Sequence, residues 1–268
     1  GYAAAVEKIK EMLRQGEAIQ VVPSVSFSAP FNGEPLTLYR RMRCENASPY
    51  MFFMRLPGIT LFGSSPEVMV QCAGGRLLSA PIAGTRRRGR NVAEDEALAA
   101  ELLEDPKERA EHMMLVDLAR NDLGRIARPG SVEVERLMMV ERFSHVMHIG
   151  STVRGEIREG FDALDAIEAV LPAGTLSGAP KIRACQLIGE LENNKRGIYG
   201  GAIGYIDFTG NMDTCIAIRI AYKKNGRVFV RSGAGIVADS VPGKEYEECI
   251  NKAKAVMNAL EQAGEVDA

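Results

Sequence analysis

Apolar residues recur at helical spacing in several separate blocks of this chain. In residues 2–14, Val6, Ile9 and Met12 fall on one side of a helix, and Gly16 follows as a stop. Residues 161–171 and 182–191 show the same spacing on either side of a short polar stretch, with an apolar stripe in the first from Phe161 to Leu171. These ranges are therefore predicted to be helical. The same reasoning predicts helices over 36–44, 91–103 and 242–262, and one that starts at Asp105.

Shorter apolar runs bounded by turn residues predict strands. The run at 19–27 contains Pro23, which favours an edge or a bend. Asn225-Gly226 is a strong hairpin signal. The segment HVMHIGS is expected to lie between two strands, and its histidines are separated by only two residues. The predicted strands cover 19–27, 51–56, 59–63, 68–72, 77–80, 132–140, 153–157, 198–207, 213–222 and 227–232.

Composition places the chain among ordinary globular proteins. It has 268 residues, of which 46% are hydrophobic and 25% charged, and its formal net charge is −2. That balance gives no electrostatic case for binding nucleic acid or a membrane surface, and no apolar run approaches the roughly 20 residues of a membrane span. The five cysteines are scattered without CxxC spacing, so we expect free thiols in a reducing cytoplasm.

The stretch LPAGTLSGAPKIR, residues 171–183, carries the most distinctive chemistry. Pro172 ends the preceding helix, and Pro180 suits the first turn of the next one. Between them lie small residues, two hydroxyls and backbone N–H groups at a helix N-terminus, which would suit a small anion. An ordinary helix–helix turn explains the same residues equally well.

The string PAGTLSGAPK resembles the signature of the chorismate-utilising enzymes, in the spelling typical of anthranilate synthase component I. Further blocks extend the resemblance from about Gln20 to the last helix. It implies an α+β fold with two antiparallel sheets packed face to face and helices outside. It also implies one chorismate-binding catalytic domain over residues 1–268. Family members carry more sequence upstream, so we expect a fragment that lacks the N-terminal region.

Two helices carry the acidic residues that the resemblance assigns to magnesium. Glu108 and Glu111 lie one turn apart, where two carboxylates either decorate a surface or share a cation. The string EHMMLVDLARNDL resembles a family block in which Glu111 would ligate Mg²⁺. In the closing helix, Glu248 would be the second ligand and Glu245 a helper.

The resemblance also assigns residues to catalysis. Glu67 follows a Ser-Pro turn and would be the general acid, although a solvated turn carboxylate is the commoner case. His148 would lie near the ring carbon that loses a proton, whereas His145 is interpreted as a core residue. Thr175, in the central stretch, would position the substrate during the reaction.

Five further residues would bind the substrate. An arginine in an apolar strand needs an anion, and the resemblance implies that Arg219 binds the enolpyruvyl carboxylate with Tyr199 beside it. Gly233 and Gly235 would present backbone N–H groups to a carboxylate. Lys252 would contact the ring carboxylate.

Two positions separate the chemistries within the family. Water-adding members carry a lysine where this chain has Gln20, and a glutamine cannot act as a general base at neutral pH. Aminodeoxychorismate synthases carry a lysine proposed to attack the ring where this chain has Ala83, whose methyl group offers no nucleophile. The attacking group would therefore be ammonia, supplied by a glutamine amidotransferase subunit. Val25 replaces a usual arginine, and the basic run at 86–90 is expected to be a solvated loop, with anion steering as the alternative.

The predicted function is that of a lyase: magnesium-dependent conversion of chorismate and ammonia to anthranilate and pyruvate, the first committed step of tryptophan biosynthesis. Three alternatives stay open. An aminodeoxyisochorismate synthase would add ammonia without eliminating pyruvate. An aminodeoxychorismate synthase is disfavoured by Ala83. A chorismate-binding module without turnover would belong to another class.

Overall fold

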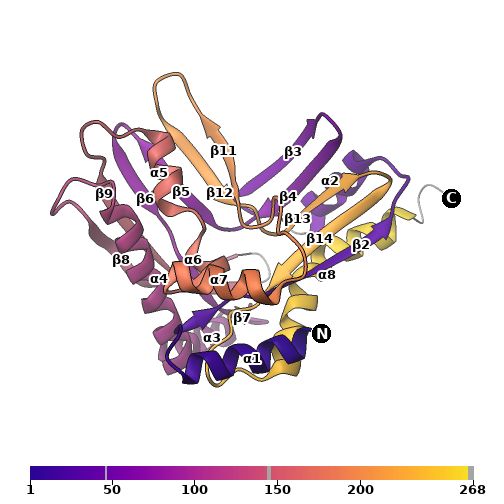
Figure 1. The fold of residues 1–268 in the computed structure, drawn as a ribbon, viewed down its shortest axis with the longest axis horizontal. Coiled ribbons are helices and arrows are strands. Elements are labelled where there is room, and N and C mark those ends of the chain that lie inside the picture. The colour runs from indigo at the N-terminus through magenta and orange to yellow at the C-terminus, as the bar shows by residue number, and fades with distance from the viewer. Residues whose placement is uncertain (46, 144–145, 265–268) are drawn as a thin grey trace. The chain divides into compact units, whose positions relative to one another are not determined.

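The computed structural model describes residues 1–268 except 46, 144–145 and 265–268. The chain divides into two compact units, each assembled from segments that are distant in sequence (Figure 1). Unit 1 contains Gly1–Pro66, Pro172–Gly201 and Ile216–Ala268. Unit 2 contains Glu67–Leu171 and Ala202–Cys215. His145 lies outside the described residues, so its predicted core position is not addressed.

Unit 1 is built on a five-stranded sheet in the order β2-β14-β13-β4-β3. Neighbouring strands run antiparallel throughout. Helices α2 and α8 cover one face of this sheet, where Leu38, Phe62 and Val256 belong to one buried cluster (Figure 1). The elements are β2 (Ser24–Pro30), β3 (Tyr50–Leu56), β4 (Ile59–Ser65), β13 (Ile220–Lys224), β14 (Arg227–Gly233), α2 (Pro35–Glu45) and α8 (Pro242–Gly264).

A second core in unit 1 joins the start of the chain to the central stretch. Ile9 of α1 and Leu187 of α7 are fully buried in one cluster with Val21. A short antiparallel ladder pairs β1 with β10, so that Gln20 lies opposite Ala179. The elements are α1 (Tyr2–Arg14), β1 (Gln20–Val21), α6 (Gly174–Ser177), β10 (Gly178–Ala179) and α7 (Lys181–Leu191).

Unit 2 is built on a seven-stranded sheet in the order β11-β12-β5-β6-β9-β7, with β8 also paired to β9. The pairings of β9 with β6, β7 and β8 are all antiparallel. Mixed helices and antiparallel sheets confirm the predicted α+β class. The strands are β5 (Val68–Ala73), β6 (Arg76–Ser79), β7 (Ile82–Arg87), β8 (Glu133–Arg142), β9 (Val146–Glu156), β11 (Ala202–Ile206) and β12 (Met212–Ile216).

Three helices complete unit 2: α3 (Val92–Glu104), α4 (Pro106–Gly124) and α5 (Ala163–Val170). Leu102 of α3 packs in a buried cluster with Met147 and Ile149 of β9. Asp105 caps α4 by accepting the backbone N–H groups of residues 107 and 108, which confirms the cap read from the sequence. Helix α4 is thereby fixed at the end that carries the predicted magnesium ligands.

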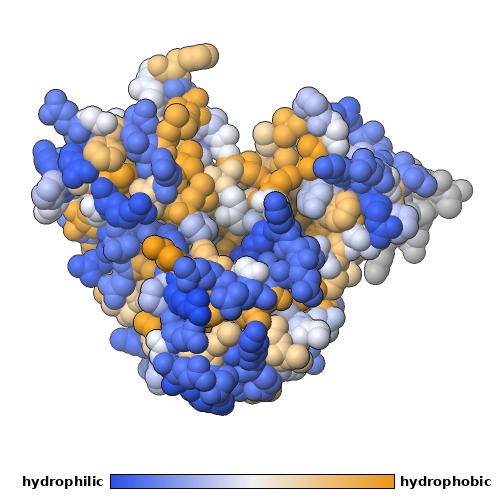
Figure 2. All heavy atoms as spheres, in the orientation of Figure 1, coloured by the Kyte–Doolittle hydropathy of each residue, from blue (hydrophilic) through white to orange (hydrophobic). Residues whose placement is uncertain are grey.

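The β11–β12 hairpin presents apolar side chains at the surface of unit 2. Figure 2 shows hydrophobic surface along this hairpin, and the residues involved include Tyr205, Ile206 and Phe208, all of them exposed. Its turn is held by Asp207, which accepts hydrogen bonds from the backbone N–H groups of residues 209 and 211. The predicted strand over 198–207 was too long: β11 covers only residues 202–206, because residues 198–200 form turns.

Two strand predictions near the site were wrong. Residues 146–151 of the segment HVMHIGS lie within β9 and not between strands, because β9 begins before the predicted start at residue 153. The predicted strand over 213–222 is two strands, since β12 pairs with β5 whereas β13 pairs with β4. Arg219 lies in the connection between them, with a φ of 52°. Tyr199 likewise lies in a turn and not on a strand.

The helices beside the central stretch were predicted correctly, but their buried faces only in part, since Val170 and Ile188 are buried as expected. In α5 the alanines at 163, 166 and 169 are buried, whereas Leu164 is 64% exposed. In α7 the buried residues include Ala184 and Leu187, whereas Ile182 is 78% exposed. Small side chains let a helix approach its neighbours closely, so alanine outranks larger apolar residues at these contacts.

No described helix is both long enough and apolar enough to span a membrane. All five cysteines are free thiols, as the sequence predicted.

Candidate functional site

In unit 2, a bulge in β7 fixes the ring of His148. Pairing between β7 and β9 shifts register between Ala83 and Arg86, and Gly84 in the bulge has a φ of 64°. The carbonyl oxygen of Gly84 lies 2.7 Å from Nδ1 of His148. A carbonyl can only accept, so Nδ1 carries a proton, and in the neutral ring Nε2 is the nitrogen with the lone pair. The backbone thereby selects a tautomer in which Nε2 can take up a proton.

Two predicted magnesium ligands lie on the same face of α4. Glu108 and Glu111 are both half-buried and are separated by three residues, which is nearly one helical turn. The carboxylate of Glu108 lies 3.4 Å from Nη1 of Arg86 on β7. Glu108 therefore links α4 to β7. Its role as a metal ligand stays a prediction.

The basic run at residues 86–90 is only in part the solvated loop that was predicted: Arg87 and Arg90 are exposed, but Arg86 and Arg88 are half-buried and form ion pairs. Arg86 contacts the carboxylates of Glu101, Asp105 and Glu108 at distances of 3.0, 3.0 and 3.4 Å. Arg88 donates to Asp95, which also accepts the backbone N–H of Gly89. The hydrogen bond from Arg88 is the main reason that the pKa of Asp95 lies well below its ordinary value.

The predicted general acid, Glu67, is a buried carboxyl group. It directly precedes β5 in unit 2, and only 6% of the residue is exposed. The commoner expectation for this turn, a solvated carboxylate, is therefore wrong. A buried carboxyl group is the kind of side chain whose proton can be held and delivered, provided that the surrounding groups favour its neutral form.

Unit 1 brings three predicted substrate-binding residues and one predicted metal ligand together. Lys252 on α8 donates to the carbonyl oxygen of Gly233 at 3.2 Å, and its Nζ is 2.5 Å from Glu248. A Cβ atom on Gly233 would lie 3.2 Å from the hydroxyl of Tyr199. Burial raises the pKa of Tyr199 to about 12, so its hydroxyl remains a neutral donor. Glu245, one turn before Glu248, is buried.

Gln20 and Gly235 form a second close contact in unit 1. Gln20 is 2% exposed, and a Cβ atom on Gly235 would lie 2.5 Å from its amide nitrogen. A side chain at Gly235 would therefore require this amide to shift. Gly178, on the paired strand, has a φ of 122° and leaves no room for a Cβ, which would lie 2.0 Å from the carbonyl oxygen of Gln20. The close approach of β10 to the Gln20 backbone therefore requires glycine at position 178.

The central stretch folds more regularly than the predicted loop. Residues 174–177 form the single-turn helix α6, and Ser177 donates its hydroxyl hydrogen to the carbonyl oxygen of Ala173. The Oγ1 atom of Thr175 is buried without a hydrogen-bond partner among the described residues. A buried hydroxyl without a partner is costly, so Thr175 is suited to a ligand that supplies the missing hydrogen bond.

Arg219 is placed by an unusual backbone conformation. Its φ of 52° lies in the left-handed region, and its carbonyl oxygen accepts the backbone N–H of Ser64 at 3.2 Å. The side chain is half-buried. The predicted role of Arg219 in binding a carboxylate stays a prediction, but its conformation is typical of residues held for function.

The predicted metal ligands have the donor chemistry that magnesium prefers. All four are carboxylates, two on α4 and two on α8, and Mg²⁺ favours oxygen donors. In the part of the chain that the structure describes, no group of three or more His, Cys, Asp or Glu side chains is arranged to hold a metal ion. Mg²⁺ usually takes one or two protein carboxylates together with waters and substrate oxygens, so these residues fit such a site.

The sequence analysis did not identify two buried polar pairs, one in each unit. His112 follows Glu111 and is fully buried, with Nε2 at 2.6 Å from the hydroxyl of Ser151 on β9. Glu192 and Arg196 form an ion pair at the C-terminal end of α7. The only signal for the second pair was a spacing of four residues between opposite charges.

Comparison with known proteins relates the whole chain to one family. A family model described as chorismate binding enzyme matches residues 1–258. Anthranilate synthase component 1 of Aquifex aeolicus is 58% identical over 260 residues, which is 97% of this chain and 53% of that protein. The chain therefore spans about half the length of the curated relatives it matches.

Solved structures give the same relationship. The crystal structure of anthranilate synthase component I from Streptococcus pneumoniae matches with a TM-score of 0.89 at 48% identity, covering 95% of this chain and 57% of that one. The menaquinone-specific isochorismate synthase of Escherichia coli matches with a TM-score of 0.87 at 24% identity, covering 97% and 60%, and shows the shared fold alone.

Proposed function

Because this chain belongs to the family of chorismate binding enzymes, we propose that it is the catalytic part of an anthranilate synthase component I. It would convert chorismate and ammonia to anthranilate, pyruvate and water, the first committed step of tryptophan biosynthesis. The observation that carries this proposal is the 58% identity over nearly the whole chain to a protein named for that activity. The same name belongs to a structural relative at 48% identity.

The residues at two positions favour ammonia as the nucleophile. Gln20 is buried, and its amide cannot accept a proton from water at neutral pH. Ala83 lies on β7 opposite Ile149, and its side chain is only a methyl group. Neither position supplies a base for water or a covalent nucleophile. Ammonia carries its own lone pair and needs neither.

Binding of the substrate would rest on groups of unit 1. Chorismate has two carboxylates, and Arg219 and Lys252 are the cations proposed to meet them. Thr175 would donate the hydrogen bond that its buried hydroxyl does not make within the described chain. Tyr199 would add a neutral donor next to Gly233, and Gly233 and Gly235 would leave their backbone accessible to a carboxylate. Fixed donors of this kind reduce the entropy lost on reaching the transition state.

Proton transfers would fall to Glu67 and His148. Ammonia adds to ring carbon C2 while the hydroxyl on C4 leaves, and Glu67 would protonate that hydroxyl so that it departs as water. In the second step the C2 proton is lost, and the bond between C3 and the enolpyruvyl oxygen breaks. Pyruvate leaves and the ring becomes aromatic. His148, with Nδ1 held by the carbonyl of Gly84, would assist with Nε2.

We propose Glu111 and Glu248 as the magnesium ligands, with Glu108 and Glu245 in support. When bound, the metal would draw electron density from the carboxylate-bearing ring and so favour attack at C2. Glu248 forms an ion pair with Lys252 at 2.5 Å, so a bound metal would share this carboxylate with the ammonium group. Glu245 is buried beside it on the same helix.

The ammonia would come from a partner. Relatives named component 1 imply a second component, and we propose a glutamine amidotransferase subunit in that role. In its absence, ammonium salts would serve as the nitrogen source. Free thiols at all five cysteines are in keeping with a reducing cytoplasm, where we place the reaction.

The test is the appearance of anthranilate fluorescence with chorismate and an ammonium salt, with and without Mg²⁺. We expect fluorescence to rise only when the metal is present. Glu111→Gln and Glu248→Gln should each abolish the response, whereas Glu247→Gln, at an exposed position beside Glu248, should retain it. If both ligand variants respond to magnesium as the parent does, the metal assignment is wrong. If the folded parent gives no anthranilate, the proposed function is wrong for this chain.

A further inference from the structure

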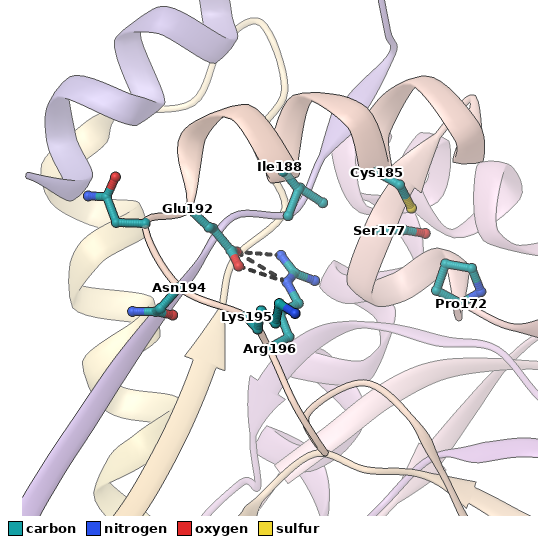
Figure 3. Close-up of a pocket in the computed structure, with 10 residues that line it drawn as sticks. Pro172, Ser177, Cys185, Ile188, Glu192, Asn194, Lys195 and Arg196 are labelled. Atoms are coloured by element: carbon teal, nitrogen blue, oxygen red, sulfur yellow. Dashed lines mark hydrogen bonds and ion pairs between the residues drawn. The ribbon is translucent and has the colours of Figure 1, made fainter.

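An ion pair in unit 1 contacts several segments that carry proposed substrate-binding residues. Glu192 and Arg196 are four residues apart, and their side chains are only 8% and 19% exposed. The Nε atom of Arg196 lies 3.2 and 3.1 Å from the two carboxylate oxygens, and Nη2 lies 2.6 Å from one of them. Figure 3 shows the guanidinium and the carboxylate facing each other, at one end of a pocket of about 450 Å³ lined in part by Ser177 and Ile188.

Arg196 also binds the backbone of two distant segments. Its Nη1 donates to the carbonyl oxygen of Leu176 at 2.6 Å, and its Nη2 donates to the carbonyl oxygen of Val22 at 2.5 Å. Leu176 follows Thr175 in α6, and Val22 lies two residues after Gln20. One guanidinium therefore fixes the segment that carries Thr175 and the segment that carries Gln20. A lysine has a single point of charge and could not make all of these bonds at once.

Glu192 holds a third segment. Its Oε1 accepts both the backbone N–H and the hydroxyl hydrogen of Ser24, each at 2.8 Å. Ser24 begins β2 and pairs with Gly233 of β14. A Cβ on Gly233 would lie 3.4 Å from the Cβ of Ser24 and 3.2 Å from the Tyr199 hydroxyl. The carboxylate thus fixes one wall of the space around the Tyr199 hydroxyl.

Tyr199 itself packs against the pair. The guanidinium carbon of Arg196 lies 5.8 Å from the centroid of the Tyr199 ring, within the range of a cation–π contact. The ring is therefore supported on one side by Arg196, while its hydroxyl reaches toward Gly233. Movement of Arg196 would displace Tyr199 and α6 together.

A second buried cation makes the charge of Glu192 necessary. The side chain of Arg231 is 7% exposed, its Nη1 lies 3.7 Å from Glu192, and its Nη2 donates to Asn194. Its Nε and Nη1 have no hydrogen-bond partner among the described residues. One carboxylate thus neutralises two guanidinium groups, and its removal would leave two buried cations unbalanced.

We propose that Arg196 and Glu192 are positioning residues that hold Thr175 and Tyr199 in the geometry needed to bind chorismate. This inference rests on the proposed function of Thr175 and Tyr199 in substrate binding. Neither member of the pair needs to touch the substrate. Loss of either would weaken substrate binding more than it would slow the reaction of bound substrate.

The test compares Arg196→Ala, Arg196→Lys and Glu192→Gln with a matched control, Arg183→Ala. Arg183 lies on the same helix, α7, and its side chain forms ion pairs with Glu17 and Glu190 and donates to Gln186. Steady-state kinetics with chorismate and ammonium give KM and kcat for each variant. Guanidinium chloride at millimolar concentration is added to Arg196→Ala, with sodium chloride as the salt control.

We expect each variant of the pair to raise the KM for chorismate by about tenfold or more, the factor that corresponds to one hydrogen bond to a charged group. The kcat and the KM for ammonium should change much less. Guanidinium, but not sodium, should lower the KM of Arg196→Ala, and Arg183→Ala should match the parent. An unchanged KM in folded pair variants, or an equal rise in Arg183→Ala, would overturn the proposal.

Hydrogen–deuterium exchange of α6 separates this inference from the proposed function, because it needs no substrate. Amides of residues 174–179 should exchange faster in Arg196→Lys than in the parent, and at the parental rate in Arg183→Ala. If the parent makes no anthranilate and α6 still exchanges faster in Arg196→Lys, the proposed function is wrong, but the positioning role of Arg196 is supported. Unchanged exchange in Arg196→Lys would contradict that positioning role, whatever the activity.

Discussion

His112 should make the stability of this protein depend on pH in the weakly acidic range. The ring is fully buried, its Nε2 lies 2.6 Å from the hydroxyl of Ser151, and its Nδ1 has no hydrogen-bond partner within the described residues. Ser151 also accepts the backbone N–H of Met138, so the histidine joins α4 to both β8 and β9. Burial lowers the pKa of His112 from its ordinary value of 6.5 to about 4.

The sign of the effect follows from this depressed pKa. As the pH falls through 6.5, the unfolded chain binds a proton at residue 112, whereas the folded chain does not until the pH approaches 4. The free energy of unfolding therefore has its full value above the pKa of the unfolded state and decreases as the pH falls from 6.5 to about 4. The full pKa shift of His112 corresponds to about 3 kcal/mol of unfolding free energy. About 2 kcal/mol of this stabilisation should be lost between about pH 7 and about pH 4.5.

The perturbation is His112→Gln, which removes the titrating ring and keeps an amide that can reach the hydroxyl of Ser151. Urea unfolding is measured for parent and variant across this pH range. The difference in unfolding free energy should shift by about 2 kcal/mol in favour of the variant as the pH falls. Carboxylates titrate equally in both proteins and cancel in the difference.

Ser151→Ala is the control for the hydrogen bond. It keeps the buried imidazole, so its stability should follow the same pH dependence as the parent, displaced by about 1 kcal/mol at every pH. NMR titration of the labelled histidines gives the pKa of His112 directly. A pKa near 6.5, or a flat difference between parent and His112→Gln, would refute this reasoning.

Three further predictions follow from individual contacts. Gly178→Ala should destabilise the fold by more than about 2 kcal/mol, because residue 178 has a φ of 122° and its Cβ would lie 2.0 Å from the carbonyl oxygen of Gln20. The control Gly189→Ala, in open space on α7, should raise the melting temperature, and equal melting temperatures of the two variants would contradict the packing argument. Asp95→Asn should lower the melting temperature at neutral pH. Because the pKa of Asp95 is depressed in the folded protein, the difference in melting temperature between parent and variant should narrow only below the ordinary aspartate pKa of 3.8. A difference that disappears at higher pH would disprove the ion-pair assignment. Glu67→Gln should abolish turnover while calorimetry still detects chorismate binding, and retained turnover would exclude Glu67 as the general acid.

Local signals in the sequence were enough to predict most helix ends and tight turns. Asp105 followed by Pro106 specified the start of α4, because both the cap and the proline act within one turn. Asn225 and Gly226 both adopt positive φ, as the hairpin between β13 and β14 requires. In each case the deciding interactions lie within a few residues.

Features set by distant contacts could not be predicted in this way. Arg219 was placed on a strand because apolar residues surround it, but the chain there leaves one sheet and joins another. His148 was placed outside a strand, but pairing with β7 and β8 extends β9 over this residue. The contact between Ser24 and Glu192 spans 168 residues, so no local pattern indicates it.

The candidate site residues were identified by resemblance to a family and not by periodicity. Spacing alone left Glu108 and Glu111 as surface carboxylates or as a cation site, and the structure adds that Glu108 contacts Arg86. The basic run was misread in part, because the sequence cannot show that α3 and α4 place acidic side chains beside it. Charge runs indicate their partners only after the fold brings the partners close.

The most direct measurement is product analysis by mass spectrometry after incubation of the chain with chorismate, magnesium and an ammonium salt enriched in nitrogen-15. We predict that one labelled nitrogen appears in anthranilate and that pyruvate forms in equal amount. A labelled product that keeps its enolpyruvyl group, or chorismate recovered unchanged from folded protein, would contradict the account.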